Sequence, residues 1–145
     1  MRSAGTTLVE LLIALAVILT LSALGWSGVQ RYRAAAALQG AARAVTRQLA
    51  LGRTLAVSRR ETIRFREGTA EVLLLAADGT ALSRLGVGRG TDLPVDSLRI
   101  RPGTIRFNAR GHAGAGSVYL WRDGRGVRLV CNFLGRVRQE FISVP

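Results

Sequence analysis

The chain has 145 residues, of which 48% are hydrophobic and 21% charged, so it can form a core and is not a disordered basic tail. All 21 basic residues are arginine, against 9 acidic residues, and the formal net charge is +12. A chain this basic is expected to attract polyanions such as nucleic acid or anionic lipid headgroups.

The N-terminal segment carries an apolar run long enough to cross a membrane. From Leu8 to Trp26 the chain has 19 residues, close to the roughly 20 that span a bilayer as a helix. Glu10 stands at the start of this run, where a carboxylate entering lipid costs on the order of 2–3 kcal/mol. An acid inside a membrane indicates a functional role with a cationic partner. The amino terminus of a neighbouring subunit would be such a partner if each chain were cut just before the run.

The residues Gly5-Thr6-Thr7-Leu8-Val9-Glu10, followed by an apolar helix, resemble the class III leader of type IV prepilins. The resemblance implies that a prepilin peptidase cuts after Gly5, that the new terminus at Thr6 is methylated, and that Glu10 pairs with a neighbour's terminus during assembly. Thr6 departs from the phenylalanine that the family usually has after the cut. Arg2, the one charged side chain of the short leader, fits a cytoplasmic N-terminus.

An ordinary secretory signal peptide is the alternative interpretation of the same run. It would end at a cleavage site near Ala23-Leu24-Gly25, and the mature chain would lose Glu10. The protein would then be a secreted basic protein. The mass of the mature N-terminus separates this alternative from the prepilin interpretation.

Beyond Trp26 the sequence predicts that the helix continues and becomes amphipathic. Arg31-Tyr32-Arg33 marks the expected exit from lipid, and the stretch 34–58 contains no proline. Glycines at positions 25, 28, 40 and 52 are interpreted either as points of bending or as points of close helix packing. Apolar residues that recur at the spacing of one helical face are Leu38, Ala41, Ala42, Val45, Leu49, Leu51, Leu55 and Ala56.

From Arg60 onward the apolar period changes to two, which predicts strands. Asp78-Gly79 predicts a tight hairpin turn, and residues 123–126 predict a second hairpin connection. The predicted fold class is α+β, with a long N-terminal helix whose first half spans a membrane and whose second half packs on an antiparallel β-sheet head. The expected strands cover residues 62–66, 70–76, 81–85, 98–100, 104–107, 117–122, 127–133 and 137–144.

Four segments are expected from these patterns. They are a leader at residues 1–5, a transmembrane and assembly helix at 6–28, an amphipathic helix at 29–59 and a β-rich globular head at 60–145. The expected location is the inner membrane, crossed once, with the head facing the periplasm until the chain joins a filament.

One cysteine and one histidine leave few candidates for catalysis or metal binding. Cys131 has no partner for an intrachain disulfide and lies in the apolar run 127–134, which favours a buried, inert thiol. His112 stands among glycines and is interpreted as a loop residue. The sequence therefore predicts a protein that is not an enzyme and that binds no metal or cofactor.

The order of segments is similar to the GspH/FimT branch of pilin-like proteins. The sharpest match is the ending Gly135-Arg136-Val137-Arg138, while residues 51–60 resemble the end of that branch's helix and 107–111 its loop before the last strands. The resemblance implies a minor pilin or pseudopilin, and its partners would be other pilin subunits, the prepilin peptidase and the inner membrane.

In FimT-type minor pilins the Gly-Arg-x-Arg segment binds DNA during natural transformation, which implies a role for Arg136 and Arg138 on double-stranded DNA. Residues two apart on a strand point the same way, about 6.6–6.8 Å apart, so two guanidiniums can grip neighbouring phosphates. Gly135 would let the backbone turn tightly or approach the ligand. The arginines expected to widen this patch from the preceding hairpin are Arg122, Arg125 and Arg128.

A pseudopilin of the GspH type is the alternative function, because those subunits of type II secretion share the fold without a DNA role. In that case the arginines would solvate the sheet or face acidic neighbours in the filament. Phosphate contacts, in contrast, would be independent of DNA sequence and would weaken steeply with salt.

Overall fold

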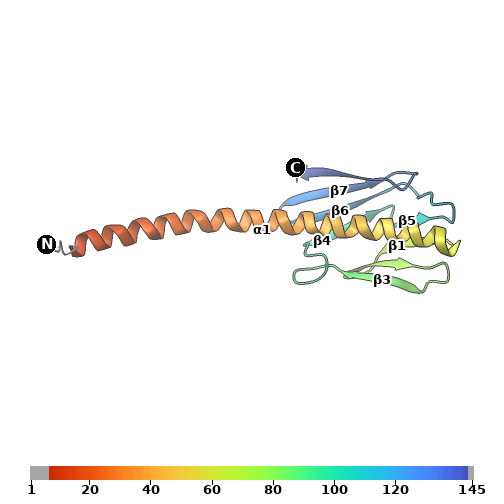
Figure 1. Cartoon of the computed structure of the whole chain (residues 1–145), viewed down its shortest axis with the longest axis horizontal. Coiled ribbons are helices and arrows are strands. Elements are labelled where there is room, and N and C mark those ends of the chain that lie inside the picture. The colour runs from red at the N-terminus through yellow and green to blue at the C-terminus, as the bar shows by residue number, and fades with distance from the viewer. Residues whose placement is uncertain (1–6, 144–145) are drawn as a thin grey trace, which may run out of the picture. The chain divides into compact units, whose positions relative to one another are not determined.

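The computed structural model describes residues 7–143, which form one helix followed by eight strands (Figure 1). The helix α1 spans Leu8–Arg59 and has 52 residues. The chain divides into two compact units, of which the first ends at Arg33 and the second begins at Ala34, so that α1 contributes to both. The strands are β1 (Ile63–Glu67), β2 (Glu71–Leu75), β3 (Ala81–Gly86), β4 (Ser97–Arg101), β5 (Thr104–Phe107), β6 (Gly116–Arg122), β7 (Arg125–Cys131) and β8 (Val137–Ser143).

The part of α1 in the first unit is apolar and uncovered. Its large apolar side chains from Leu8 to Leu21 are between 50% and 77% exposed. By length and composition this helix is able to cross a membrane. Contiguous apolar surface of this extent is unfavourable in water and marks a contact with lipid or with other protein chains.

In the second unit, α1 buries the face that the spacing of apolar residues predicted. Leu38, Val45, Leu49 and Ala56 are among the residues of this face that lie in the core. Leu51 was predicted to belong to it, and this is wrong, because its side chain is 42% exposed. A helix turns about 100° per residue, so position 51 lies roughly 200° from position 49 and points away from the sheets.

Gly52, and not the predicted Leu51, lies on the buried face of α1. A Cβ at this position would lie 2.8 Å from Cδ1 of Leu74 and 3.2 Å from the ring of Phe107, so glycine lets the helix backbone approach the sheet closely. Gly40, in contrast, would meet nothing within 4 Å. The close-packing interpretation of the helix glycines therefore holds at position 52 and not at position 40.

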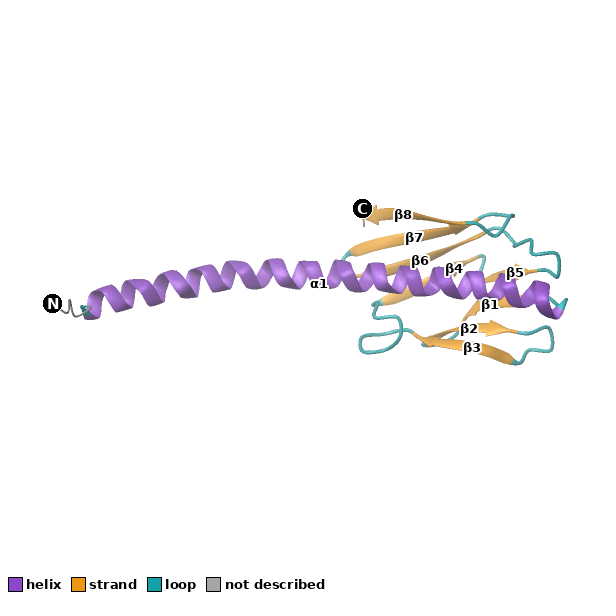
Figure 2. Ribbon diagram, in the orientation of Figure 1, coloured by secondary structure: helices purple, strands orange, loops and turns teal. Residues whose placement is uncertain are grey.

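The predicted antiparallel head is confirmed, and it consists of two four-stranded sheets. One sheet has the strand order β3-β2-β1-β5 and the other β4-β6-β7-β8. The second half of α1 lies across both sheets (Figure 2). Strand residues alternate between the core and solvent, and the largest buried side chains include Phe65, Phe107, Ile105, Leu120 and Leu129.

The hairpin between β6 and β7 is tighter than the sequence predicted. Its loop contains only Asp123 and Gly124, which have φ angles of 48° and 73°, and β7 begins already at Arg125. Positive φ at both loop residues matches the twist of the flanking strands. As a result Arg122 and Arg125 are direct partners in the ladder.

Candidate anion-binding face

The register of the second sheet gathers arginines from three strands on one face. Tyr119 of β6 is the direct partner of Arg99 in β4 and of Arg128 in β7, and Arg128 is in turn the partner of Glu140 in β8. Direct partners in an antiparallel pair share a face, and here it is the face turned away from the core. We call this surface the basic face, and it consists of Arg99, Arg101, Tyr119, Arg128, Arg136, Arg138 and Glu140.

Two guanidiniums flank the ring of Tyr119 at the centre of the basic face. The Cζ of Arg128 lies 5.6 Å from the ring centroid and the Cζ of Arg101 lies 5.9 Å from it. The Nε and Nη2 of Arg128 both donate to Oγ of Ser117 at 3.3 Å, which holds this side chain against the sheet. Cation–π contacts of this kind hold both guanidiniums beside the tyrosine ring.

Carboxylates neutralise only part of the basic face. Glu140 lies 3.8 Å from both Arg128 and Arg138, and Glu67 of β1 lies 3.0 Å from Arg99. The side chain of Arg138 is 84% exposed, so its ion pair is weak in water. Five arginines against these two carboxylates leave a surplus of three positive charges.

The turn between β7 and β8 explains the glycine of the Gly-Arg-x-Arg ending. The N–H of Gly135 donates to the carbonyl of Asn132 at 2.9 Å, and the N–H of Arg136 donates to Oδ1 of Asn132 at 2.9 Å. Gly135 has a φ of 73°, the left-handed conformation that the hairpin loop needs at this point. Arg136 is exposed at the end of this turn. It precedes Arg138 by two residues, so alternation along the chain places it on the basic face.

Arg122 and Arg125 do not join Arg128, which corrects the predicted grouping of the three. Arg122 and Arg125 are ladder partners and share a face, and Arg128 follows Arg125 by an odd number of residues, so strand alternation turns it to the opposite face. Arg125 is exposed at the hairpin end. The side chain of Arg122 is only 19% exposed, and its Nη1 donates to the carbonyl of Pro94.

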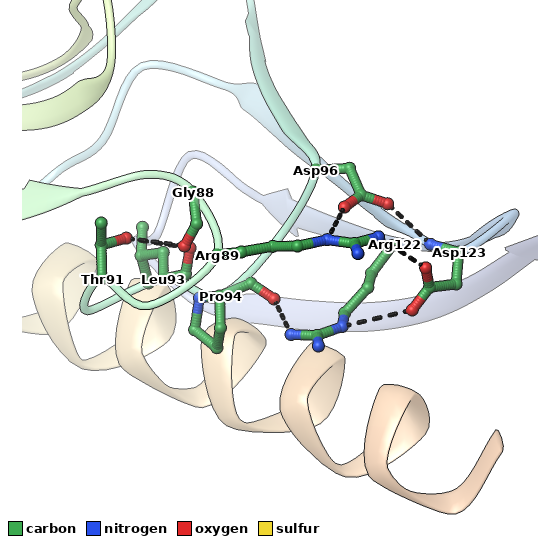
Figure 3. A network of polar contacts seen from close by, with 8 residues as sticks. All are labelled: Gly88, Arg89, Thr91, Leu93, Pro94, Asp96, Arg122 and Asp123. Carbon is green, nitrogen blue, oxygen red and sulfur yellow. Dashed lines mark hydrogen bonds and ion pairs between the residues drawn. The ribbon is translucent and has the colours of Figure 1, made fainter. Parts of the chain in front are cut away.

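Arg122 belongs to a polar network that fastens the loop before β4 to the hairpin (Figure 3). Arg89 bridges two carboxylates, with Nε 3.1 Å from Asp96 and Nη2 2.9 Å from Asp123. The backbone N–H of Asp123 donates to Oδ2 of Asp96 at 2.8 Å. This hydrogen bond and then the Arg89 guanidinium hold the pKa of Asp96 below its ordinary value. The role of Arg122 in this network is structural.

Of the remaining residues that the sequence analysis singled out, those that the structure describes are not part of the basic face. Gly5 and Thr6 fall outside the described residues. Glu10 lies exposed in the first turn of α1, where its N–H donates to Oγ1 of Thr7 at 3.3 Å. Cys131 is buried, as predicted, and burial raises the pKa of its thiol. Within the described part of the chain, no group of three His, Cys, Asp or Glu side chains is placed to hold a metal ion.

Sequence reasoning missed Arg99, Arg101 and Tyr119. The segment Arg99-Ile100-Arg101 has the same Arg-x-Arg spacing as the C-terminal pair, and this spacing was a signal that both side chains share a face. The contribution of Tyr119 had no such local signal, because it depends on which strands are neighbours.

The chain matches no family model and no curated protein, but its fold matches solved structures. The type IV minor pilin FimU of Pseudomonas aeruginosa aligns with a TM-score of 0.56 at 20% identity, over 71% of this chain and 87% of that chain. The minor pseudopilin EpsH of the type 2 secretion system of Vibrio cholerae aligns with a TM-score of 0.55 at 13% identity, over 73% of this chain and 96% of that chain. The fold is therefore that of minor pilins and minor pseudopilins, which confirms the predicted fold.

Proposed function

We propose that this chain is a minor pilin that is anchored in the inner membrane, joins a filament of pilin subunits and binds double-stranded DNA through the basic face. The observation that carries the DNA-binding role is the surplus of positive charge on one sheet face, where five arginines meet two carboxylates. Arg138 is 84% exposed on the edge strand β8, and Arg136 is exposed just before this strand.

Phosphate is the ligand chemistry that this surface fits. A guanidinium keeps its charge at any working pH and offers a planar fork of donors to phosphate oxygens. The arginines lie on a rigid sheet with same-strand neighbours about 6.6–6.8 Å apart, so several can contact one DNA backbone together. Such contacts carry no base information, and the expected binding is independent of DNA sequence.

The N-terminal part of the chain supports assembly. Its exposed apolar side chains suit lipid before assembly and the helices of other subunits afterwards. We infer that the prepilin peptidase cuts after Gly5, that Thr6 becomes the methylated terminus, and that Glu10 pairs with the terminus of a neighbouring subunit. The four segments at 1–5, 6–28, 29–59 and 60–145 then serve as leader, membrane anchor, stem of the head and head.

A minor pseudopilin of a secretion system is the second candidate, and the likeness to EpsH favours it. In that role the basic face would contact carboxylates of adjacent subunits and would have no DNA ligand. The two functions differ in one measurable property, which is whether the folded protein binds free DNA.

The test is a salt titration of DNA binding by the full chain in a non-ionic detergent, with fluorescent duplex DNA of random sequence. The logarithm of the association constant should fall linearly with the logarithm of salt concentration. The double variant Arg136→Gln/Arg138→Gln should bind more weakly, with a slope reduced by about 1.8, since each lost phosphate contact removes about 0.9.

The matched control is Arg43→Gln/Arg47→Gln, which removes the same charge from exposed positions on α1. This control should keep the slope of the unchanged protein. An equal reduction in both double variants would show a diffuse charge effect and contradict a site on the basic face. No binding at low salt by the folded, unchanged protein would favour the pseudopilin.

A further inference from the structure

A groove beside the turn between β7 and β8 combines an aromatic wall with cationic and amide groups. Its volume is about 470 Å³, which is within the usual range for pockets that hold small ligands. Arg128, Arg138 and the residues that they contact do not line this groove. Its lining includes Thr62, Arg106, Asn108, His112, Gly114 and Phe133.

The aromatic wall consists of two stacked rings. The ring centroids of His112 and Phe133 are 4.7 Å apart and the planes differ by 13°. The N–H of His112 donates to Oδ1 of Asn108 at 3.0 Å, and the carbonyl of Phe133 accepts from the N–H of Ala113 at 2.9 Å. Hydrogen bonds to the backbone thus fix the loop positions of both residues. The side chain of Phe133 remains 62% exposed. The stack is a preformed platform with an open surface.

An arginine of the first sheet lies beside this platform. Arg106 lines the groove, and the register makes it the direct partner of Arg64 on the outer face of the first sheet. Like charges directly opposite each other destabilise a sheet, and within the described residues neither side chain forms an ion pair. No carboxylate is among the described residues that line the groove.

We propose that this groove binds an unpaired base of single-stranded DNA, with the base stacked on Phe133 and a flanking phosphate on Arg106. An open aromatic surface beside a cationic side chain is the combination that binds single strands without sequence preference. In a duplex each base is already stacked between its neighbours and is not accessible to such a platform. The inference rests on the proposed DNA binding and adds to it a preference for strands with unpaired bases.

Apolar contact with another protein fits the groove less well. A protein partner that covered Phe133 would also bury Arg106, and a buried guanidinium requires a carboxylate or other acceptors from that partner. A nucleotide supplies both parts at once, because its base is flat and aromatic and its phosphate is anionic.

The test compares a fluorescent 12-residue oligothymidylate with a random duplex of the same length, using the full chain in non-ionic detergent. Phe133→Ala and Phe133→Leu should each weaken binding of the oligothymidylate by about fivefold or more, as expected for one lost stack. Duplex binding should change by less than about twofold. Phe133→Leu keeps an apolar side chain in the turn and therefore separates loss of the aromatic plane from loss of packing.

The matched control is Phe141→Ala, because Phe141 is an aromatic residue of β8 with 70% exposure that lies outside the groove. This variant should leave both affinities unchanged. Arg106→Gln should reduce the salt slope for the oligothymidylate by about 0.7, the value for one phosphate contact on a single strand. The ultraviolet circular dichroism of each variant confirms that it is folded.

Three results would overturn the inference, and they differ from a failure of the proposed function. Unchanged oligothymidylate binding in Phe133→Leu, or an equal loss for duplex and oligothymidylate, would contradict base stacking. Loss of filament incorporation with unchanged oligothymidylate binding would identify the groove as a contact between subunits. If the unchanged protein bound neither DNA, the proposed function itself would be wrong.

Discussion

Gly135 of the β7–β8 turn lies directly against the side chain of Arg53 in α1, so closely that a Cβ at position 135 would be 2.9 Å from Cδ of Arg53. The Nε of Arg53 in turn donates to the carbonyl of Gly111 at 3.0 Å. One helical arginine therefore braces both the loop that carries His112 and the turn that carries Phe133. Arg53 therefore links the two loops beside the groove to α1.

The contact predicts that Gly135→Ala destabilises the head more than Gly124→Ala does. Both glycines have a φ of 73°, but a Cβ at position 124 would meet nothing within 4 Å. Gly124→Ala should lower the free energy of unfolding by about 1 kcal/mol through backbone strain alone. Gly135→Ala should lower it by about 2 kcal/mol, because displacement of Arg53 and loss of its hydrogen bond to Gly111 are added to the strain. Urea unfolding followed by near-ultraviolet circular dichroism measures both, and equal losses would contradict the bracing contact.

Replacement of the bracing arginine itself should loosen both loops. Arg53→Met removes the hydrogen bond to Gly111 and should lower the free energy of unfolding by about 1 kcal/mol. Amide hydrogen exchange should become faster in residues 108–115 and 132–136. Arg47→Met, an exposed position on the same helix, is the control and should leave these amides unchanged. Faster exchange spread evenly over the head would indicate a general loss of stability instead.

The network around Asp96 predicts a fall in stability in acid. The pKa of Asp96 is lowered in the folded protein, so its contribution is present above the pKa of the unfolded chain and is lost as pH falls through the folded pKa. The melting temperature should therefore fall as pH drops below about 4. Asp96→Asn should flatten this fall and should also lower the melting temperature at neutral pH. Melting curves that run parallel in acid for the variant and the unchanged protein would exclude Asp96 as a source of the pH dependence.

The assembly role proposed for Glu10 predicts a separation of processing from incorporation. Glu10→Ala should be cut after Gly5 as efficiently as the unchanged chain, because the cleavage site is intact, but it should be missing from filaments. The mass of the mature N-terminus reports the first step, and immunoblots of sheared filaments report the second. Glu61→Ala serves as the control, because it removes an acidic side chain between α1 and β1, far along the chain from Glu10. Normal incorporation of Glu10→Ala would refute the assignment.

The sequence by itself determined the elements of this protein. The change of apolar period from one helical face to strict alternation marked the end of the helix, and the predicted strand 104–107 agrees with β5 at both ends. The starts of β3 and β8 and the end of β6 also agree, and the other strand ends are displaced by one or two residues, as for β1 and the start of β7. These features are local, because they depend on side chains within a few positions of one another.

Only the tertiary structure decided which arginines act together. Alternation along a strand shows that Arg136 and Arg138 share a face, but it does not show that β4 and β7 flank β6 and so bring Arg101 and Arg128 to the same tyrosine. In the same way β5 pairs with β1, which begins about forty residues earlier, and this pairing places Arg106 beside Arg64. Strand order and register follow from how separate apolar faces are buried together against α1, and that burial is a property of the whole chain.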